Sequence, residues 1–347
     1  MLKPYSKAEV SFELRNEIGQ EGANSQTYVA HDDQLDAEIV IKKIPKRELD
    51  SVDVFFDESR ILYLSSHPNV VQIHYACQDA DSIFIAMPYY RSGSLNALID
   101  RRFLTVREIV VLGCQIASGL HNIHSKDLIH FDIKPDNILL SDRGEALISD
   151  FGLSRKVNRE GAAEQDRLYF KMRPPEAYNG DQHTRAFDIY QFGATLYRMC
   201  NGNQAFEEQF TEFGADPASF DRNAFKFAVT NGRFPDRDIF EEHVPERLRR
   251  LVKRCLDPDP AARFPAAVDV ANELAQVEDR LDWQFERQGT KRIWQRSEDT
   301  KSYSLTVESD GTSVATKTTD SGRTTRITGY CKDKITSRDI RRFLGET

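Results

Sequence analysis

Three patterns in the sequence predict an α+β fold in which a small β-rich lobe precedes a larger helical lobe and a small β-rich module. Short apolar runs at residues 39–41 and 83–87, each bounded by polar residues, are typical of buried strands. From about residue 107 onward, apolar residues recur at three- and four-residue steps, as they do on one face of a helix. After residue 280, apolar and polar residues alternate with period two, most clearly at residues 303–308.

The remaining elements follow from the same periodicities. Helical spacing at residues 54–64 predicts one helix between the two N-terminal strands. In the larger lobe, helices are expected near residue 107 and at residues 188–199, 246–255 and 266–277. In the last part, a meander of three strands is expected at residues 303–308, 313–318 and 323–330. A short helix at residues 336–344 should follow it, with Thr336 or Ser337 as its cap.

Charge divides the 347-residue chain into two parts. The whole chain has a formal charge of −8, whereas residues 281–347 carry 13 Lys and Arg against 10 Asp and Glu. This overall acidity argues against a nucleic-acid footprint along the whole chain. We therefore expect one unit at residues 10–280 and a C-terminal accessory module at residues 281–347.

Composition indicates a soluble, cytoplasmic protein that does not enter a membrane. No segment approaches the roughly 18 apolar residues of a membrane helix. The first 15 residues, MLKPYSKAEVSFELR, carry charge where a signal peptide needs an apolar core. The five cysteines are scattered and form no C-x-x-C pair, which argues against a disulfide scaffold or a zinc ribbon.

The strongest chemical signal is the segment HFDIKPDN at residues 130–137, followed by Asp-Phe-Gly at residues 150–152. Together they resemble the catalytic loop and the metal-binding D-F-G motif of protein kinases. Phe131 stands where most kinases have arginine, so this is an HFD variant of the family's HRD motif. An H-x-D motif on its own would indicate only a surface loop. The resemblance to protein kinases rests on the two motifs together, with Asp150 18 residues after Asp132.

The resemblance implies a role for four residues of these motifs. Phosphoryl transfer asks the protein mainly for positioning and charge neutralisation. Asp132 would orient the acceptor hydroxyl, and Lys134 would neutralise the transferred γ-phosphoryl group. Asn137 and Asp150 would hold the Mg²⁺ or Mn²⁺ ions that bridge the phosphates of ATP.

Further motifs supply the expected ATP-binding parts in order. Residues 39–42 match the V-A-I-K strand, so Lys42 should contact the α- and β-phosphates. Glu58 matches the helical glutamate that pairs with this lysine. Met87 would be the gatekeeper of the hinge, and the backbones of Pro88 and Tyr90 would contact adenine.

The phosphate-covering loop departs from the family's pattern. Aligning Thr27-Tyr28-Val29-Ala30 with the end of the family motif puts Gly22 at the second glycine and Ser25 at the third. Gly19 then lies one residue further from Gly22 than the first glycine of the family motif lies from the second. Small residues still allow the backbone to approach phosphate, so ATP binding is expected.

Three later residues resemble the family's structural framework. Glu176 ends a P-P-E segment that resembles A-P-E, and it would pair with Arg263. Asp188 would anchor the backbone of the catalytic loop. This trio separates protein kinases from aminoglycoside-type phosphotransferases. The chain is therefore identified as a member of the eukaryotic-like protein kinases, of bacterial or phage type, with an N-lobe at residues 10–90 and a C-lobe at residues 91–280.

Two departures bear on regulation and specificity. An apolar Phe131 cannot pair with a phosphorylated activation loop, and residues 150–176 contain only two hydroxyls, those of Ser154 and Tyr169. We expect activity without activation-loop phosphorylation. Lys134 favours transfer to serine and threonine, whereas Tyr169 stands where such kinases usually have threonine, so the two indications disagree.

The implied function is transfer of the γ-phosphoryl group of ATP to serine and threonine hydroxyls of unidentified protein substrates, with autophosphorylation included. One alternative is a pseudokinase scaffold, which the irregular glycine loop favours. Another is a nucleic-acid-binding regulator that acts through basic residues of the C-terminal module, unless these are simply solvated charges. They are Arg323, Arg326, Lys332, Lys334, Arg338, Arg341 and Arg342. His121 and His124 would suit a metal, but the second is a common packing residue in the family.

Overall fold

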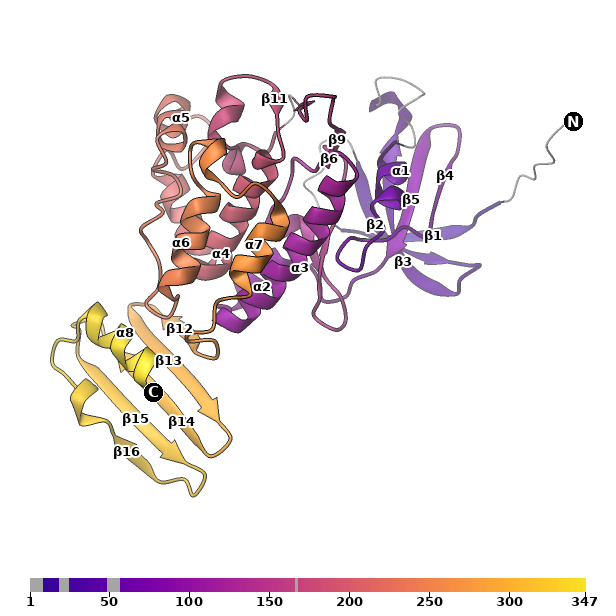
Figure 1. The fold of residues 1–347 in the computed structure, drawn as a ribbon. Helices are drawn as coiled ribbons and strands as arrows, with labels where there is room; N and C mark the ends of the chain where they lie inside the picture. The colour runs from indigo at the N-terminus through magenta and orange to yellow at the C-terminus, as the bar shows by residue number, and fades with distance from the viewer. Residues whose placement is uncertain (1–8, 19–24, 49–56, 166–167) are drawn as a thin grey trace, which may run out of the picture.

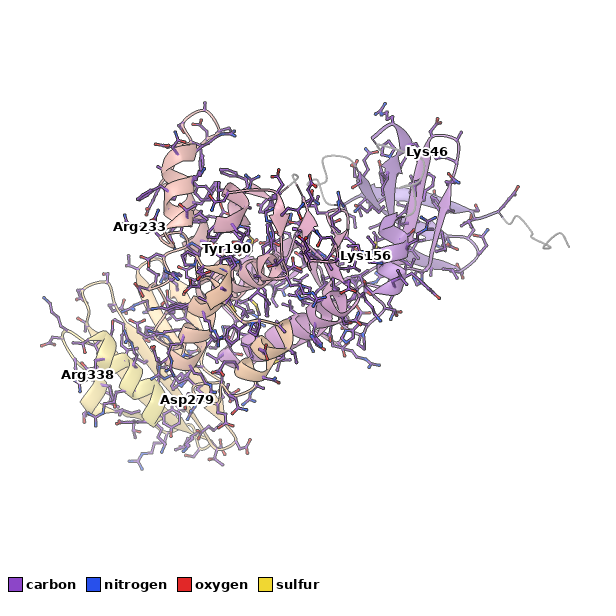
Figure 2. The ribbon with its side chains drawn as sticks, turned by 45° about the horizontal axis from the view of Figure 1, so that its top comes forward. Lys46, Lys156, Tyr190, Arg233, Asp279 and Arg338 are labelled. Carbon is purple, nitrogen blue, oxygen red and sulfur yellow. The ribbon has the colours of Figure 1, made fainter. Side chains whose placement is uncertain are left out.

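The computed structural model describes residues 9–18, 25–48, 57–165 and 168–347, without the side chains of residues 48, 57 and 58. The chain forms three bodies in a row, with the helical lobe between the N-terminal sheet and the C-terminal module (Figure 1). Lys46 and Arg338 mark the two opposite ends of this row (Figure 2). The predicted α+β fold class is thereby confirmed.

The N-lobe is an antiparallel sheet of order β1-β2-β3-β5-β4 with one helix. Its elements are β1 Phe12–Glu17, β2 Gln26–Asp32, β3 Ala37–Pro45, α1 Asp57–Leu64, β4 Tyr75–Gln78 and β5 Ser82–Pro88. Successive side chains of a strand point to opposite faces. In β3, Ile39 and Ile41 join a small apolar cluster, while Val40 and Lys42 line a cleft on the other face. The alternation in β3 therefore supplies both the core of the lobe and one wall of the cleft.

The C-lobe is built around two long helices. Its helices are α2 Leu95–Arg101, α3 Val106–Ser125, α4 Ala186–Thr211, α5 Arg222–Thr230, α6 Glu246–Cys255 and α7 Ala267–Leu274. Helix α3 begins with a capping box in which Thr105 and Glu108 satisfy each other's backbone N–H groups. Helix α4 is almost entirely buried up to a kink at Gly202, whose φ of 81° is left-handed. That kink explains why the predicted helix 188–199 covers only the first part of α4.

Short two-stranded ribbons hold the loops of the C-lobe. They pair β6 Leu128–Ile129 with β9 Arg155–Lys156, β7 Ile138–Leu140 with β8 Ala146–Ile148, and β10 Ala163–Glu164 with β11 Gln182–His183. The first two ribbons bracket residues 130–137 and 149–154. They hold in one place the two segments that carry the catalytic motifs.

The C-terminal module is a five-stranded antiparallel sheet with one helix on one face. Its elements are β12 Gln284–Gln288, β13 Lys291–Glu298, β14 Lys301–Val307, β15 Ser313–Thr319, β16 Thr324–Arg326 and α8 Ser337–Glu346. Phe285, Trp294, Leu305 and Ala315 stand opposite one another across four strands and form the core under α8. Thr336 caps α8, and Trp283 donates from its indole nitrogen to the carbonyl of Leu344 at 2.9 Å.

Two expectations for this module are wrong. The meander has five strands rather than three, because β12 and β13 carry so few apolar residues that their alternation is hidden among charges. The strand expected at residues 323–330 ends at Arg326, and residues 328–330 form a turn of 3-10 helix. There Tyr330 turns inward and packs edge-on against Phe343 of α8, with ring centroids 5.1 Å apart.

The module lies directly against the C-lobe. Phe103, which precedes α3, packs against Phe285 with ring centroids 4.6 Å apart. Arg107 donates to both carboxylate oxygens of Asp282, at 2.6 and 2.8 Å. Arg292 donates from its Nη1 alone to both carboxylate oxygens of Glu242, at 2.7 and 2.9 Å. The contact thus combines an aromatic pair with two ion pairs, of which the Arg107–Asp282 pair is forked.

No helix within the described part of the chain has the length and apolarity that crossing a membrane requires.

Candidate active site

The backbone of the catalytic loop is held by two side chains of α4. The carboxylate of Asp188, which is fully buried, accepts from the backbone N–H groups of His130 and Phe131, both at 2.8 Å. Gln191 accepts from the N–H of Ile133 at 2.9 Å and donates to the carbonyl of Phe131 at 3.1 Å. These bonds hold Phe131 at a left-handed φ of 69°, a conformation that costs a non-glycine residue free energy.

Asp132 is buried beside two donors and keeps one oxygen free of described partners. Its Oδ2 accepts from Asn137 Nδ2 at 2.7 Å and lies 3.0 Å from the ammonium of Lys134. Its Oδ1 is buried and has no hydrogen-bond partner among the described residues. Burial raises the pKa of Asp132, while the nearby Lys134 opposes that rise. The result is a positioned carboxylate with one oxygen able to accept a proton.

Asp150 lies across the same space from Asp132 and pairs with the N-lobe. Its Oδ1 is 2.8 Å from Lys42 Nζ, and this ammonium holds the pKa of Asp150 well below its ordinary value. The Asp150 side chain is 45% exposed, so the carboxylate faces the cleft. Asn137 uses its amide nitrogen on Asp132, which leaves its carbonyl oxygen available. Two hard oxygen donors on one side of the cleft fit a divalent cation such as Mg²⁺.

A cleft of about 390 Å³ lies between the lobes. Lys42, Asn137 and Asp150 are among the residues that line it. The expected hinge residues all line it as well; they are Met87, Pro88 and Tyr90. Apolar side chains of Ile18, Val40 and Leu139 complete the walls. The flat heteroaromatic ring of a nucleotide would fit between such walls, with the phosphates of that nucleotide toward Lys42.

Part of the expected ATP site lies outside the described residues. Gly19 and Gly22 of the phosphate-covering loop fall in the undescribed stretch 19–24, and the side chain of Glu58 is not described. Ser25, at the end of that loop, does line the cleft. The pairing of Glu58 with Lys42 therefore stays a prediction.

Phe131 is the centre of an apolar cluster where most kinases place a cation. The ring is fully buried and packs edge-on against Phe187 at 4.9 Å and against His183 at 5.9 Å. Ile129 and Ala163 complete the cluster. Burial also lowers the pKa of His183, so this imidazole adds no positive charge near neutral pH. The cluster offers hydrocarbon and ring edges to residues 150–176, which we call the activation segment.

Tyr169 of the activation segment covers Lys134. The Lys134 ammonium lies 4.2 Å from the centre of the Tyr169 ring, within the range of a cation–π interaction. The ring therefore lies next to the Asp132–Lys134 pair, at the position where serine/threonine kinases have a smaller side chain.

The end of the activation segment is tied to α4 and to the α6–α7 connection through Arg263. This guanidinium is completely buried and makes a forked pair with Glu176, with both distances 2.7 Å. It also donates to the carbonyls of Ala186 and Asp257. One buried cation thus joins three segments.

His124, one of the two helical histidines, has a structural partner. His124 is buried and bonds through Nε2 to Asp188 at 2.8 Å, so it is part of the framework under the catalytic loop. Among the residues that the structure describes, no group of three His, Cys, Asp or Glu side chains could hold a metal ion.

Two groups of functional residues were not assigned from the sequence. The period-two alternation of residues 39–42 could have placed Val40 beside Lys42 on the cleft wall. No local signal could have found Gln191, because its partners lie 58 and 60 residues away in the chain.

Comparisons with known proteins agree with this geometry. The model of the family described as "Protein kinase domain" matches residues 12–274. Serine/threonine-protein kinase PknK of Mycobacterium bovis is 30% identical over 286 residues, which cover 80% of this chain and 24% of that protein. Protein kinase 2 of Dictyostelium discoideum is 32% identical over 57% of this chain and 42% of its own length. Ribosomal protein S6 kinase alpha-1 of Rattus norvegicus is 26% identical over 78% of this chain and 36% of its own length. The chain thus spans between about a quarter and two fifths of the length of these relatives.

Proposed function

The chain belongs to the protein kinase family, and from this premise we propose that it transfers the γ-phosphoryl group of ATP to serine and threonine hydroxyls of proteins. The observation that carries the proposal is the convergence of four side chains on one cleft. Lys42, Asn137 and Asp150 line the cleft, and Asp132 joins them through its hydrogen bond from Asn137.

Each of these residues has a definite task in the proposed reaction. The free Oδ1 of Asp132 accepts the hydrogen bond, and finally the proton, of the acceptor hydroxyl. Lys134 stays beside Asp132 and neutralises charge on the transferred group. Lys42 binds the phosphates that remain on the nucleotide. Asn137 and Asp150 would hold Mg²⁺ or Mn²⁺, which when bound neutralises the phosphate oxygens.

The proposed preference for serine and threonine rests on two observations. Lys134 stands two residues after Asp132, as in serine/threonine kinases, and the printed name of the PknK relative describes a serine/threonine kinase. Phosphoamino-acid analysis of the product distinguishes this preference from dual specificity.

Activity without activation-loop phosphorylation is also part of the proposal. The described side chains that form the apolar cluster around Phe131 are hydrophobic, so they supply no cation to a phosphate. Ser154 is only 2% exposed and donates to the carbonyl of His130 at 3.4 Å, so its hydroxyl is not accessible to another kinase. The double variant Ser154→Ala, Tyr169→Phe should keep most of its activity. Loss of most activity in this variant would refute this part of the proposal.

The central test is transfer of radiolabelled phosphate from ATP. Wild type should label itself and a mixed serine/threonine peptide library in the presence of Mg²⁺ or Mn²⁺. Asp132→Ala should lose at least about a hundredfold in rate, since a positioned base contributes about 10²–10⁴-fold. Asp142→Ala, an exposed acid in the β7–β8 turn, is the matched control. Absence of transfer by wild type with either metal would instead indicate a pseudokinase scaffold.

The nucleic-acid alternative finds little support in the C-terminal module. Among its seven candidate basic residues, Lys332 is paired with Asp339 at 2.9 Å and Arg342 with Glu346 at 2.6 Å. These carboxylates reduce the positive field of the face that would have to bind phosphates.

A further inference from the structure

A second cavity of the C-lobe, separate from the nucleotide cleft, is rich in arginine. We call it the arginine groove, and its volume is about 820 Å³. Its walls come from Asp127, just before β6, from the activation segment, from residues 184–186 at the start of α4, and from α6 and the α6–α7 connection. The lining residues of the last two groups and of the activation segment are Val157, Asn158, Arg159, Gly161, Arg254, Pro260, Ala261, Arg263, Phe264 and Pro265. No residue that lines the nucleotide cleft lines this groove.

The groove carries positive charge on an acidic protein. Its ionisable lining consists of Arg159, Arg185, Arg254 and Arg263 against the single acid Asp127, although the whole chain has a formal charge of −8. Arg263 is neutralised by Glu176. The other three guanidiniums give the groove its field, and an acidic ligand would be drawn to it.

These three arginines are available to a ligand. Arg159 and Arg254 are exposed, and neither has a carboxylate partner within the described part of the chain. Arg185 pairs with Asp127 at 2.9 Å, but the two side chains are 41% and 62% exposed, so a competing carboxylate could replace Asp127 at little cost. Beyond Arg254, the acids Asp269 and Glu273 line a neighbouring depression.

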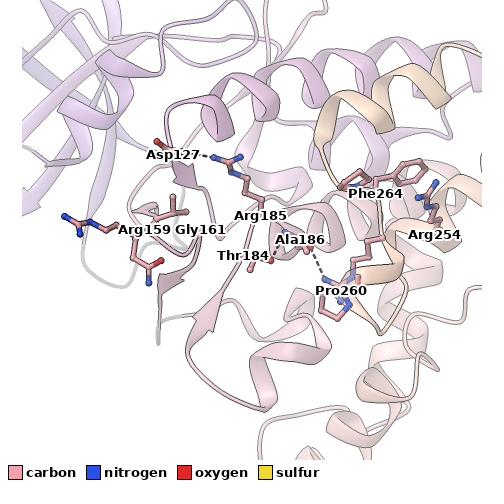
Figure 3. Close-up of a pocket in the computed structure, with 14 residues that line it drawn as sticks. Asp127, Arg159, Gly161, Thr184, Arg185, Ala186, Arg254, Pro260 and Phe264 are labelled. Carbon is pink, nitrogen blue, oxygen red and sulfur yellow. Dashed lines mark hydrogen bonds and ion pairs between the residues drawn. The ribbon is translucent and has the colours of Figure 1, made fainter.

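The arginines are spread along the groove. In Figure 3, Arg159 lies at one end of the view, Arg185 in the middle and Arg254 at the far end. A single small anion could not contact all three, whereas an extended chain with acidic side chains at intervals could. Between the arginines, apolar groups of Val157, Ala186, Ala261 and two prolines offer contacts for a peptide backbone and its small side chains.

We propose that the arginine groove is a docking site for an extended acidic segment of a partner protein. Carboxylates of the segment bind Arg159, Arg185 and Arg254, and Asp127 is the internal group that they displace from Arg185. Nucleic acid fits less well, because the groove offers only three guanidiniums besides Arg263, which Glu176 neutralises. The one aromatic ring of the lining, Phe264, is also already covered by Arg254 at 4.1 Å and cannot stack on a base.

The test measures binding of a fluorescein-labelled octapeptide of alternating alanine and glutamate to the full chain by fluorescence anisotropy. The double variant Arg159→Ala, Arg254→Ala should bind about tenfold more weakly, because it removes two exposed ion pairs. The double variant Arg143→Ala, Arg323→Ala removes the same charge outside the groove and should bind like wild type. The analogous peptide with glutamine in place of glutamate should not bind measurably.

Asp127→Asn gives the opposite sign and so separates docking from a structural role. Asparagine tolerates the left-handed φ of 57° at this position and frees Arg185, so the acidic peptide should bind about threefold more tightly. Asp132→Ala should bind the peptide like wild type, so the docking result does not depend on phosphotransfer.

Three results would overturn the proposal. The first is wild-type affinity in the Arg159→Ala, Arg254→Ala protein, and the second is equal binding of the glutamine peptide. The third is displacement of the peptide by an oligouridylate octamer at a lower concentration than by unlabelled peptide, which would assign the groove to nucleic acid. The single variant Arg159→Ala should weaken binding of the peptide about threefold. Because this side chain is exposed, its removal should leave the fold intact, so the single variant tests the proposal even if the double variant misfolds.

Discussion

Replacing Phe131 by arginine tests whether the apolar cluster under the activation segment is a closed part of the fold. In most kinases this position is a cation, so the change would restore the common residue. In this chain we expect Phe131→Arg to destabilise the protein, because the ring is completely buried among Ile129, Ala163, His183 and Phe187. Phe131→Leu is the matched comparison, since it keeps an apolar side chain on the same left-handed backbone.

The magnitude follows from two contributions to the free energy of unfolding. Loss of a buried phenylalanine ring removes about 1.5–3 kcal/mol of hydrophobic stabilisation. Placing an unpaired guanidinium among rings and methyl groups adds a desolvation cost of several kcal/mol. We expect Phe131→Arg to lose about 4 kcal/mol or more, and Phe131→Leu to lose about 1.5 kcal/mol through a partly filled cavity.

Thermal unfolding without nucleotide measures the difference. At about 2 °C per kcal/mol for a large domain, the arginine variant should melt about 8 °C below wild type and the leucine variant about 3 °C below it. Leucine should preserve phosphotransfer. The reasoning is refuted if Phe131→Arg melts with wild type and its activity becomes dependent on phosphorylation of the activation segment.

Three further predictions concern the site itself. Lys42→Met should lower the rate of phosphotransfer at least about a hundredfold, because it removes the ammonium that binds phosphate and pairs with Asp150 at 2.8 Å; steady-state kinetics check this. The turnover rate at saturating ATP should fall on acidification through a pKa above the ordinary aspartate value, since burial raises the pKa of Asp132 and the protonated acid cannot accept a proton. The same shift means that the folded state retains a proton that the unfolded state has released, so ionisation of Asp132 lowers stability as the pH rises through that window. Glu176→Gln should lower the free energy of unfolding by about 3–5 kcal/mol, because it leaves the buried guanidinium of Arg263 uncompensated; denaturant unfolding measures the loss.

Each of these predictions has a control or an outcome that contradicts it. Lys43→Met, one residue away on the opposite face of β3, should leave the rate unchanged, and equal loss in both lysine variants would show that charge alone is responsible. A turnover rate that stays constant down to about pH 4 would contradict the raised pKa of Asp132. Glu160→Gln, at an exposed acid of the activation segment, should unfold at the wild-type denaturant concentration.

Local patterns were sufficient where a residue's environment is set by its neighbours in the chain. The apolar run of β3, the periodicity of α3 and the bounds of α6 could be predicted from the sequence, because each follows a simple local pattern of apolar residues. Local patterns did not predict β12 and β13. Burial of Phe285 and Trp294 in these strands depends on packing of the sheet against α8, which follows about 50 residues later in the chain.

The amino-acid sequence alone predicted which groups would react, because the motifs around Asp132 and Asp150 resemble those of protein kinases in order and spacing. Only the tertiary structure could decide what surrounds them. Whether Phe131 is sealed by Phe187, whether Tyr169 covers Lys134, and whether Arg159, Arg185 and Arg254 share one groove all depend on contacts between distant segments. Burial and electrostatic interaction depend on distances in space, and the spacing of residues along the chain does not determine these distances.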